Sequence, residues 1–184
     1  AREKILASKT IERGPLIVHT GSGKGKSTAA FGMVFRALGN GMKVGVVQFV
    51  KGKWETGERA VLEKFPDTCV IRSMGEGFTW ETQDRERDIA AANGAWDMAK
   101  DMMADPSYDM ILLDELNICL RYDYLNIDEV VATLDARRDM LHVIVTGRNA
   151  KDALIEAADL VTEMGQIKHP FREQNVKAQR GVEF

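Results

Sequence analysis

The sequence predicts an α/β fold, a mostly parallel β-sheet with helices on both faces. Short apolar segments alternate along the chain with segments of helical periodicity. The apolar segments are continuous rather than alternating, which indicates strands buried on both faces of a parallel sheet. A glycine-rich segment at residues 20–28 joins the first apolar segment to the first helical one, as in phosphate-binding α/β domains.

The strands and helices follow one another from Pro15 onward. Apolar runs predict strands at residues 16–18, 44–50, 69–71, 110–113, 143–145 and 160–164. Apolar residues three and four positions apart predict helices from the glycine-rich segment to residue 39, and at 58–65, 82–104, 126–134 and 150–158. Glycines at 39 and 41 and prolines at 66 and 106 end three of these helices, and Asn126 with Glu129 resembles a capping box.

The composition fits one globular domain. A chain of 184 residues with 45% hydrophobic residues can bury a core without cross-links. Residues 1–14, of mixed charge and without a clear period, could be a short helix or an arm, and residues 15–184 are expected to form a single domain. The three histidines lack metal-ligand spacing, so no zinc site is expected.

Charge and apolar content narrow the class of protein. The 25 Lys and Arg against 28 Asp and Glu give a net charge of −3, which argues against a nucleic-acid partner. No apolar run approaches the ~20 residues that span a bilayer, and no signal-peptide core follows the first residues, so neither a membrane protein nor a secreted one is expected. Cys69 and Cys119 lie in apolar surroundings and are expected to be buried thiols in a reducing, cytoplasmic compartment.

The most specific feature is the phosphate-binding pattern Gly21-Ser22-Gly23-Lys24-Gly25-Lys26-Ser27-Thr28. Its glycines allow the backbone to direct several N–H groups toward an anion, and the following helix N-terminus and Lys26 add positive charge. The Ser27 hydroxyl can bind Mg²⁺. The usual spacing is G-x-x-x-x-G-K-[ST], but residue 20 is a threonine and the first glycine is Gly21, so this loop is one residue short. We therefore expect it to hold phosphates differently from a kinase loop.

A second nucleotide element is the apolar strand that ends in Asp114-Glu115, which resembles a Walker B segment. Parallel strands bring their carboxyl ends to one edge of the sheet, so both carboxylates are expected near Ser27. Such a pair after a strand is often only a cap or a surface turn. Beside the phosphate loop, Ser27, Asp114 and Glu115 predict a site for Mg²⁺ or Mn²⁺.

Three further segments are candidates for the same edge. In the loop 75–80, Phe78 and Trp80 would project to one side and could form a flat apolar surface for a planar ligand, or be two core aromatics. Arg148 follows a strand and could contact phosphate or ribose, or be a surface arginine. Residues 51–54 also follow a strand and could reach the pocket, whereas the basic stretch from Lys168 to Arg180 fits a solvated tail.

Together these segments resemble the P-loop ATP:corrinoid adenosyltransferases, over about residue 15 to the C-terminus. The segments that carry the resemblance are 19–32, 46–52, 77–82, 113–116, 146–148 and 176–184. The Gly-Phe-Thr-Trp element together with the short loop is far more specific than a P-loop alone. Ser22 stands where family members often have Asn, a change expected to be harmless.

The resemblance implies a RecA-like P-loop NTPase fold that forms homodimers, and an enzyme that transfers the 5′-deoxyadenosyl group of ATP to the Co(I) of a reduced corrinoid, cobalamin or cobinamide. Triphosphate leaves whole and lies reversed in its loop relative to kinases, which fits the missing residue. Phe78 and Trp80 would displace the lower cobalt ligand and ease reduction by an electron donor such as a reduced flavoprotein. Lys26 and Glu115 would act on the triphosphate, Glu115 through the metal.

Two other functions remain open from the residues alone. A P-loop kinase or RecA-like ATPase would use Asp114 and Glu115 to bind metal and activate water, and would release ADP and phosphate. A nucleotide-dependent module that binds nucleic acid is disfavoured by the acidic balance of the chain.

Overall fold

A computed structural model describes residues 5, 7–50, 56–73 and 85–183. Its centre is a parallel sheet of six strands in the order β3-β2-β4-β5-β1-β6. The strands are β1 (Leu16–Thr20), β2 (Val44–Gln48), β3 (Cys69–Ser73), β4 (Met110–Asp114), β5 (His142–Thr146) and β6 (Leu160–Glu163). The predicted α/β class with a parallel sheet is confirmed.

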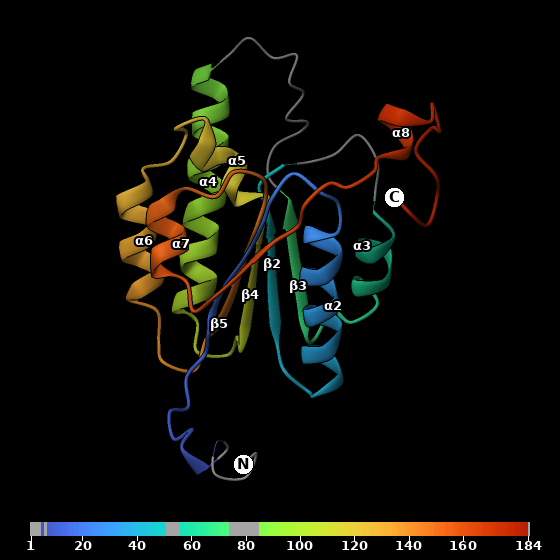
Figure 1. The fold of residues 1–184 in the computed structure, drawn as a ribbon. Helices are drawn as coiled ribbons and strands as arrows, with labels where there is room; N and C mark the ends of the chain where they lie inside the picture. The colour runs from blue at the N-terminus through green and yellow to red at the C-terminus, as the bar shows by residue number, and fades with distance from the viewer. Residues whose placement is uncertain (1–4, 6, 51–55, 74–84, 184) are drawn as a thin grey trace.

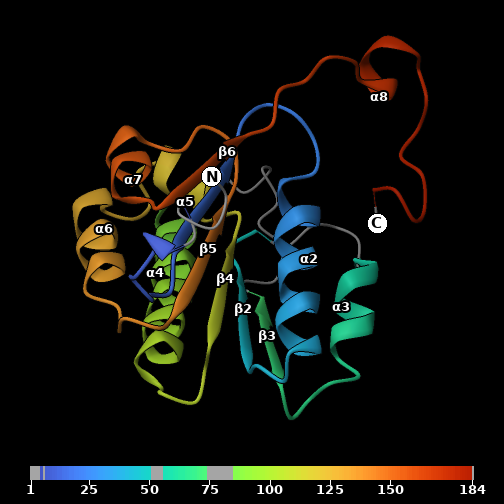
Figure 2. The same cartoon turned by 60° about the horizontal axis from the view of Figure 1, so that its bottom comes forward.

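Helices cover both faces of the sheet (Figure 1). They are α2 (Lys26–Gly39), α3 (Gly57–Leu62), α4 (Arg85–Ala104), α5 (Leu116–Arg121), α6 (Ile127–Asp135), α7 (Asp152–Ala157) and α8 (Pro170–Glu173). Helices α2 and α3 lie on one face, and α4 to α7 lie on the other, an arrangement that the turned view in Figure 2 also shows. The short α8 and the C-terminal residues lie on the side of α2 and α3.

The core consists of two apolar clusters, one on each face of the sheet, because successive strand residues point to opposite faces. In β1, Leu16 and Val18 belong to the cluster beneath α4, α5 and α6, whereas Ile17 belongs to the cluster beneath α2. The two cysteines divide in the same way: Cys119 lies in the first cluster and Cys69 in the second. Both are buried free thiols, as predicted.

Several boundaries differ from those predicted. Helices α5 and α8 were not expected, and β2 ends at Gln48 rather than at residue 50. Strand β6 is exposed along its whole length, and β3 has the exposed Arg72 on one face, so the expectation that every strand is buried on both faces is wrong for these two strands. The position of β6 explains its exposure, because β6 is an edge strand that pairs only with β1. Asn126 does cap α6, where its side chain accepts from the N–H groups of Asp128 and Glu129.

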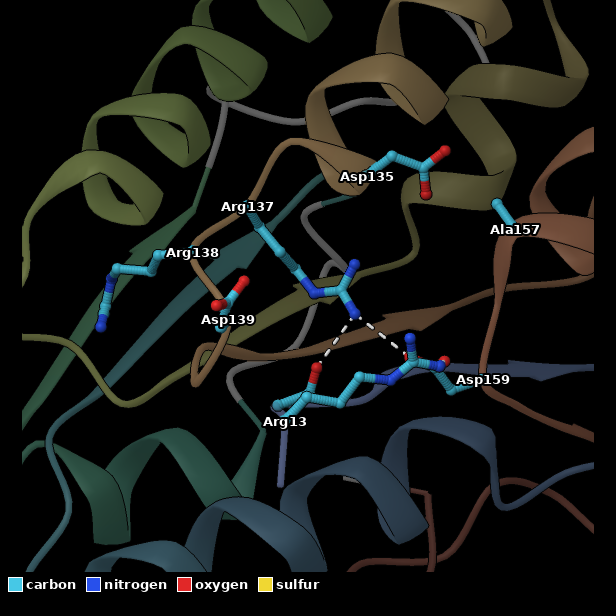
Figure 3. A pocket seen from close by; sticks show the side chains of 8 residues that line it. Arg13, Asp135, Arg137, Arg138, Asp139, Ala157 and Asp159 are labelled. Atoms are coloured by element: carbon cyan, nitrogen blue, oxygen red, sulfur yellow. Dashed lines mark hydrogen bonds and ion pairs between the residues drawn. The ribbon is translucent and has the colours of Figure 1, made fainter. Parts of the chain in front are cut away.

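The edge of the sheet at the amino ends of the strands is held by charged side chains (Figure 3). Asp159 accepts from the Leu16 N–H at 2.8 Å, from Arg137 at 3.1 Å and from Arg13. Asp159 and the two arginines line a cavity of about 230 Å³ whose walls mix arginines with aspartates. The cavity therefore lies at the opposite edge from the glycine-rich segment, and Asp159 ties the start of β6 to the start of β1.

None of the helices in the described part of the chain combines the length and the apolar character that a membrane crossing requires.

Candidate functional site

The glycine-rich segment turns between the end of β1 and the start of α2 and is packed against the residues that follow β6. The Gly23 N–H donates to the carbonyl of Met164 at 2.7 Å, and the Met164 N–H donates to that of Thr20 at 2.9 Å. A Cβ on Gly21 would lie 2.4 Å from the Met164 oxygen, and one on Gly23 would lie 2.6 Å from the Gly165 oxygen. Glycine is therefore required here because backbone packs directly on backbone.

Lys26 opens α2 directly after Gly25, and only 6% of its surface is exposed. Its ammonium donates to the carbonyl oxygen of Gly23, so the side chain folds back over the loop. Burial lowers the pKa of Lys26, the carboxylate of Glu115 opposes this, and the charges of Arg148 and Lys24 lower it further. A buried cation with one carbonyl as its partner would gain strongly from an anion in the loop.

Asp114 ends β4 and is buried beside the phosphate loop. The Thr146 hydroxyl donates to its Oδ1 at 2.8 Å, and the Gln48 amide approaches its Oδ2 at 3.4 Å. Burial raises the pKa of Asp114, and hydrogen bonds from Thr146, Ser27 and Gln48 oppose that rise. The predicted proximity of Asp114 and Ser27 is thus present, because β1 and β4 are separated only by β5.

Glu115 lies between β4 and α5 in a left-handed conformation with φ of 62°. Its N–H donates to the Thr146 hydroxyl at 2.9 Å, so this hydroxyl connects Glu115 to Asp114. Burial raises the pKa of Glu115 to about 7, the charge of Asp114 adds to the rise, and Lys26 and Arg148 oppose it. Among the residues that the structure describes, the buried Oε2 of Glu115 has no hydrogen-bond partner.

Arg148 belongs to the same cluster, because its charge acts on both Lys26 and Glu115. The turn that carries it is held on two sides. The Gly147 N–H donates to the His19 carbonyl at 3.2 Å, and the buried Asn117 side chain donates to the Gly147 carbonyl at 2.9 Å. The carboxyl ends of β1, β4 and β5 thus bring Lys26, Glu115 and Arg148 together.

A hard divalent cation fits these residues. Ser27, Asp114 and Glu115 offer one hydroxyl and two carboxylates, and the Glu115 Oε2 has no partner in the described part of the chain. Within the residues that the structure describes, no group of three or more His, Cys, Asp and Glu side chains could hold a metal by itself. A site of this kind matches Mg²⁺, which typically takes one or two carboxylates and completes its shell with water and substrate phosphate.

The other predicted residues have different surroundings. Ser22, Lys24 and Thr28 are exposed, and Lys24 forms an ion pair with Glu183 near the C-terminus. Phe78, Trp80 and residues 51–54 lie outside the described residues.

Sequence reasoning did not assign Gln48, Thr146 or Asn117 to the site. Gln48 and Thr146 are each a polar last residue that directly follows the apolar run of its strand, which is the signal that marks them.

The fold resembles that of two solved structures. With the flagellar accessory protein FlaH from Methanocaldococcus jannaschii the TM-score is 0.53 at 14% identity, covering 89% of this chain and 76% of that one. With the RadB recombinase the TM-score is 0.51 at 16% identity, covering 91% and 82%. At these identities the likeness shows the fold alone, which is the predicted RecA-like P-loop fold.

Sequence relatives are far closer. The chain is 60% identical to a corrinoid adenosyltransferase of Sinorhizobium sp., covering 100% of this chain and 86% of the relative. It is 58% identical to that of Pseudomonas aeruginosa (99% and 89%) and 50% identical to that of Escherichia coli K12 (100% and 93%). Residues 12–184 match the family model of the ATP:corrinoid adenosyltransferases BtuR/CobO/CobP. The chain therefore belongs to the ATP:corrinoid adenosyltransferase family.

Proposed function

We propose that this chain transfers the 5′-deoxyadenosyl group of ATP to the Co(I) of a corrinoid and releases intact triphosphate. Family membership supports the adenosyl transfer. The observation that carries the proposal for this chain is the buried Lys26 in a short phosphate loop beside Glu115 and Arg148. A kinase or RecA-like ATPase is not favoured, because the relatives of high identity are named corrinoid adenosyltransferases.

The protein does not have to supply a nucleophile for this reaction. The reduced cobalt of the substrate is the nucleophile, so the chain must hold C5′ of ATP in line with it and stabilise charge on the departing triphosphate. The first N–H groups of α2 have no partner within the helix and, with Lys26, would bind that charge. Arg148 would add a cation from the neighbouring strand end.

The metal-binding residues complete this set. Mg²⁺ or Mn²⁺ held by Ser27, Asp114 and Glu115 would supply positive charge against the triphosphate. Burial beside Asp114 raises the pKa of Glu115, and a bound cation would favour its ionised form, so we assign Glu115 the task of holding the metal. The Thr146 hydroxyl donates to the Asp114 carboxylate and accepts from the Glu115 backbone N–H, so it holds Asp114 beside the Glu115 backbone.

The corrinoid side of the proposal depends on Phe78 and Trp80, whose side chains would cover one face of the corrin ring and displace the lower cobalt ligand. A cobalt without that ligand accepts an electron more easily, here from a reduced flavoprotein. We further propose a homodimer in the cytoplasm.

Trp80→Ala should slow adenosylation from Co(II) much more than from chemically reduced Co(I). An equal loss in both assays would reject the role of Trp80 in displacing the lower cobalt ligand.

The proposal is tested by incubating chemically reduced cobalamin with ATP and Mg²⁺, following the cobalt–carbon product by its absorption spectrum and quantifying the phosphate products. We expect one triphosphate for each adenosylcobalamin formed. Lys26→Ala should nearly abolish turnover, whereas Lys64→Ala, an exposed lysine after α3, should leave it unchanged. Release of ADP and phosphate without adenosylcobalamin would reject the proposal in favour of an ATPase or kinase.

A further inference from the structure

A row of polar side chains runs from α3 across the carboxyl ends of β3, β2 and β4. Arg59 Nη1 donates to Ser73 Oγ at 2.6 Å, and Ser73 Oγ donates to Gln48 Oε1 at 2.9 Å. Gln48 Nε2 then approaches Asp114 Oδ2 at 3.4 Å. We call these four residues, Arg59, Ser73, Gln48 and Asp114, the polar row.

The sheet itself creates the polar row. In the parallel register Gln48 is paired with Ser73 of β3 on one side and with Asp114 of β4 on the other. Paired residues of neighbouring strands point to the same face, at about 5 Å from one another. The three side chains must therefore lie side by side, and each is the last residue of its strand.

The donors in the polar row all point the same way. A guanidinium can only donate, so the Ser73 oxygen accepts from Arg59 and its single proton goes to Gln48 Oε1. This fixes the orientation of the Gln48 amide, whose NH₂ group is left to face Asp114. Glu63 accepts from Nε of Arg59 at 2.7 Å and holds that guanidinium at its other edge.

Asp114 consequently has a neutral donor facing each oxygen: the Thr146 hydroxyl at Oδ1 and the Gln48 amide at Oδ2. The first contact is short, whereas the second is long, and the Ser27 hydroxyl also donates to this carboxylate. We propose that Gln48 is a positioning residue that orients Asp114 toward the metal–triphosphate complex, and that Ser73 and Arg59 hold Gln48 for this task. The proposal rests on the metal–ATP site of the proposed function.

The test measures metal binding rather than turnover. Free Mn²⁺ is followed by electron paramagnetic resonance as it is titrated into each protein with ATP present, and ATP binding is measured separately by calorimetry in EDTA. Gln48→Leu and Ser73→Ala should each weaken Mn²⁺ binding about tenfold, the loss typical of a residue that orients a metal ligand. ATP binding in EDTA should change less than about twofold, because neither side chain is expected to contact ATP.

Two controls separate positioning from a structural defect. Ser73→Thr keeps the hydroxyl and should restore Mn²⁺ binding to near the wild-type value. Arg72→Ala removes an exposed cation from the adjacent position of β3, on the other face of the sheet, and should leave Mn²⁺ binding unchanged. Weakening of ATP binding in EDTA as large as that of Mn²⁺ binding, an unchanged Mn²⁺ affinity, or failure of Ser73→Thr to restore it would each overturn the proposal.

The two proposals fail in different experiments. Wild-type protein that binds Mn²⁺ with ATP but forms no adenosylcobalamin refutes the proposed function and leaves the comparison of variants valid. Wild-type protein that forms adenosylcobalamin, with Gln48→Leu binding Mn²⁺ as the wild type does, refutes only the positioning role.

Discussion

Replacing Glu115 by glutamine should stabilise the ligand-free protein at neutral and alkaline pH. Burial raises the pKa of this carboxyl from 4.5 to about 7, so the folded chain holds its proton more tightly than the unfolded chain. The free energy of unfolding therefore falls as the pH rises from about 4.5 to 7, and above pH 7 the ionised carboxylate is a full cost to the fold. Glutamine carries no charge and avoids that cost.

The size of the effect follows from the pKa. A rise from 4.5 to about 7, at roughly 1.4 kcal/mol for each pKa unit, gives about 3.5 kcal/mol as an upper bound. Residual solvent around the side chain reduces this figure. For a domain of this size, 1 kcal/mol shifts the melting temperature by about 2–4 °C, so at pH 8 the Glu115→Gln protein should melt up to roughly 10 °C higher.

The assay is thermal unfolding of both proteins between pH 4 and 9, without nucleotide or metal. The two curves should meet near pH 4.5 and separate progressively up to about pH 7. Glu156→Gln, on the exposed face of α7, should follow the wild type throughout. With ATP and Mg²⁺ added, the wild type should gain stability and Glu115→Gln much less. A constant difference at all pH values, or a less stable variant at pH 8, would refute this reasoning.

Two further substitutions test the packing around the site and at the opposite edge, both by urea unfolding. Gly147→Ala should lower the free energy of unfolding by about 2–4 kcal/mol, because φ is +128° and a Cβ would lie 2.8 Å from that of Asn117. Gly32→Ala, with open space around it in α2, should instead raise the free energy of unfolding by up to about 1 kcal/mol. Equal effects of the two substitutions would contradict this explanation. Asp159→Ala should lower the free energy of unfolding by about 1–2 kcal/mol, because two arginines and a strand amide lose their acceptor. Asp97→Ala removes an exposed ion pair on α4 and should change the free energy of unfolding by less than about 0.5 kcal/mol. A loss no larger than that of this control would show that Asp159 does not hold the edge.

Much of the fold could be predicted because the central strands are continuous apolar runs that match their burial. β4 is buried at every residue, and its apolar run covers the whole strand except the final Asp114. α5 could not be predicted, because six residues directly after a strand are too short to show a helical period. β6 begins with a pair of apolar residues as its neighbour β1 does, and only the strand order reveals that it is an exposed edge.

The site residues likewise divide into those that the sequence predicts and those that it does not. Lys26 and Ser27 follow from a local pattern, and Asp114 follows from the rule that parallel strands share a carboxyl edge. The contributions of Gln48 and Thr146 depend on which strands are neighbours and in which register, and a single sequence does not show either. The raised pKa of Glu115 depends on burial in three dimensions and likewise could not be predicted.

The reactivity of the two cysteines can report local opening of the protein. Burial raises the pKa of Cys69 to about 11 and that of Cys119 to about 12, so both thiols should be nearly inert to alkylating reagents while the chain is folded. Because they belong to different apolar clusters on the two faces of the sheet, each becomes reactive when its own layer of helices opens. Peptide mapping of alkylation over time would therefore measure separately how fast the helices on each face of the sheet open, without any engineered label.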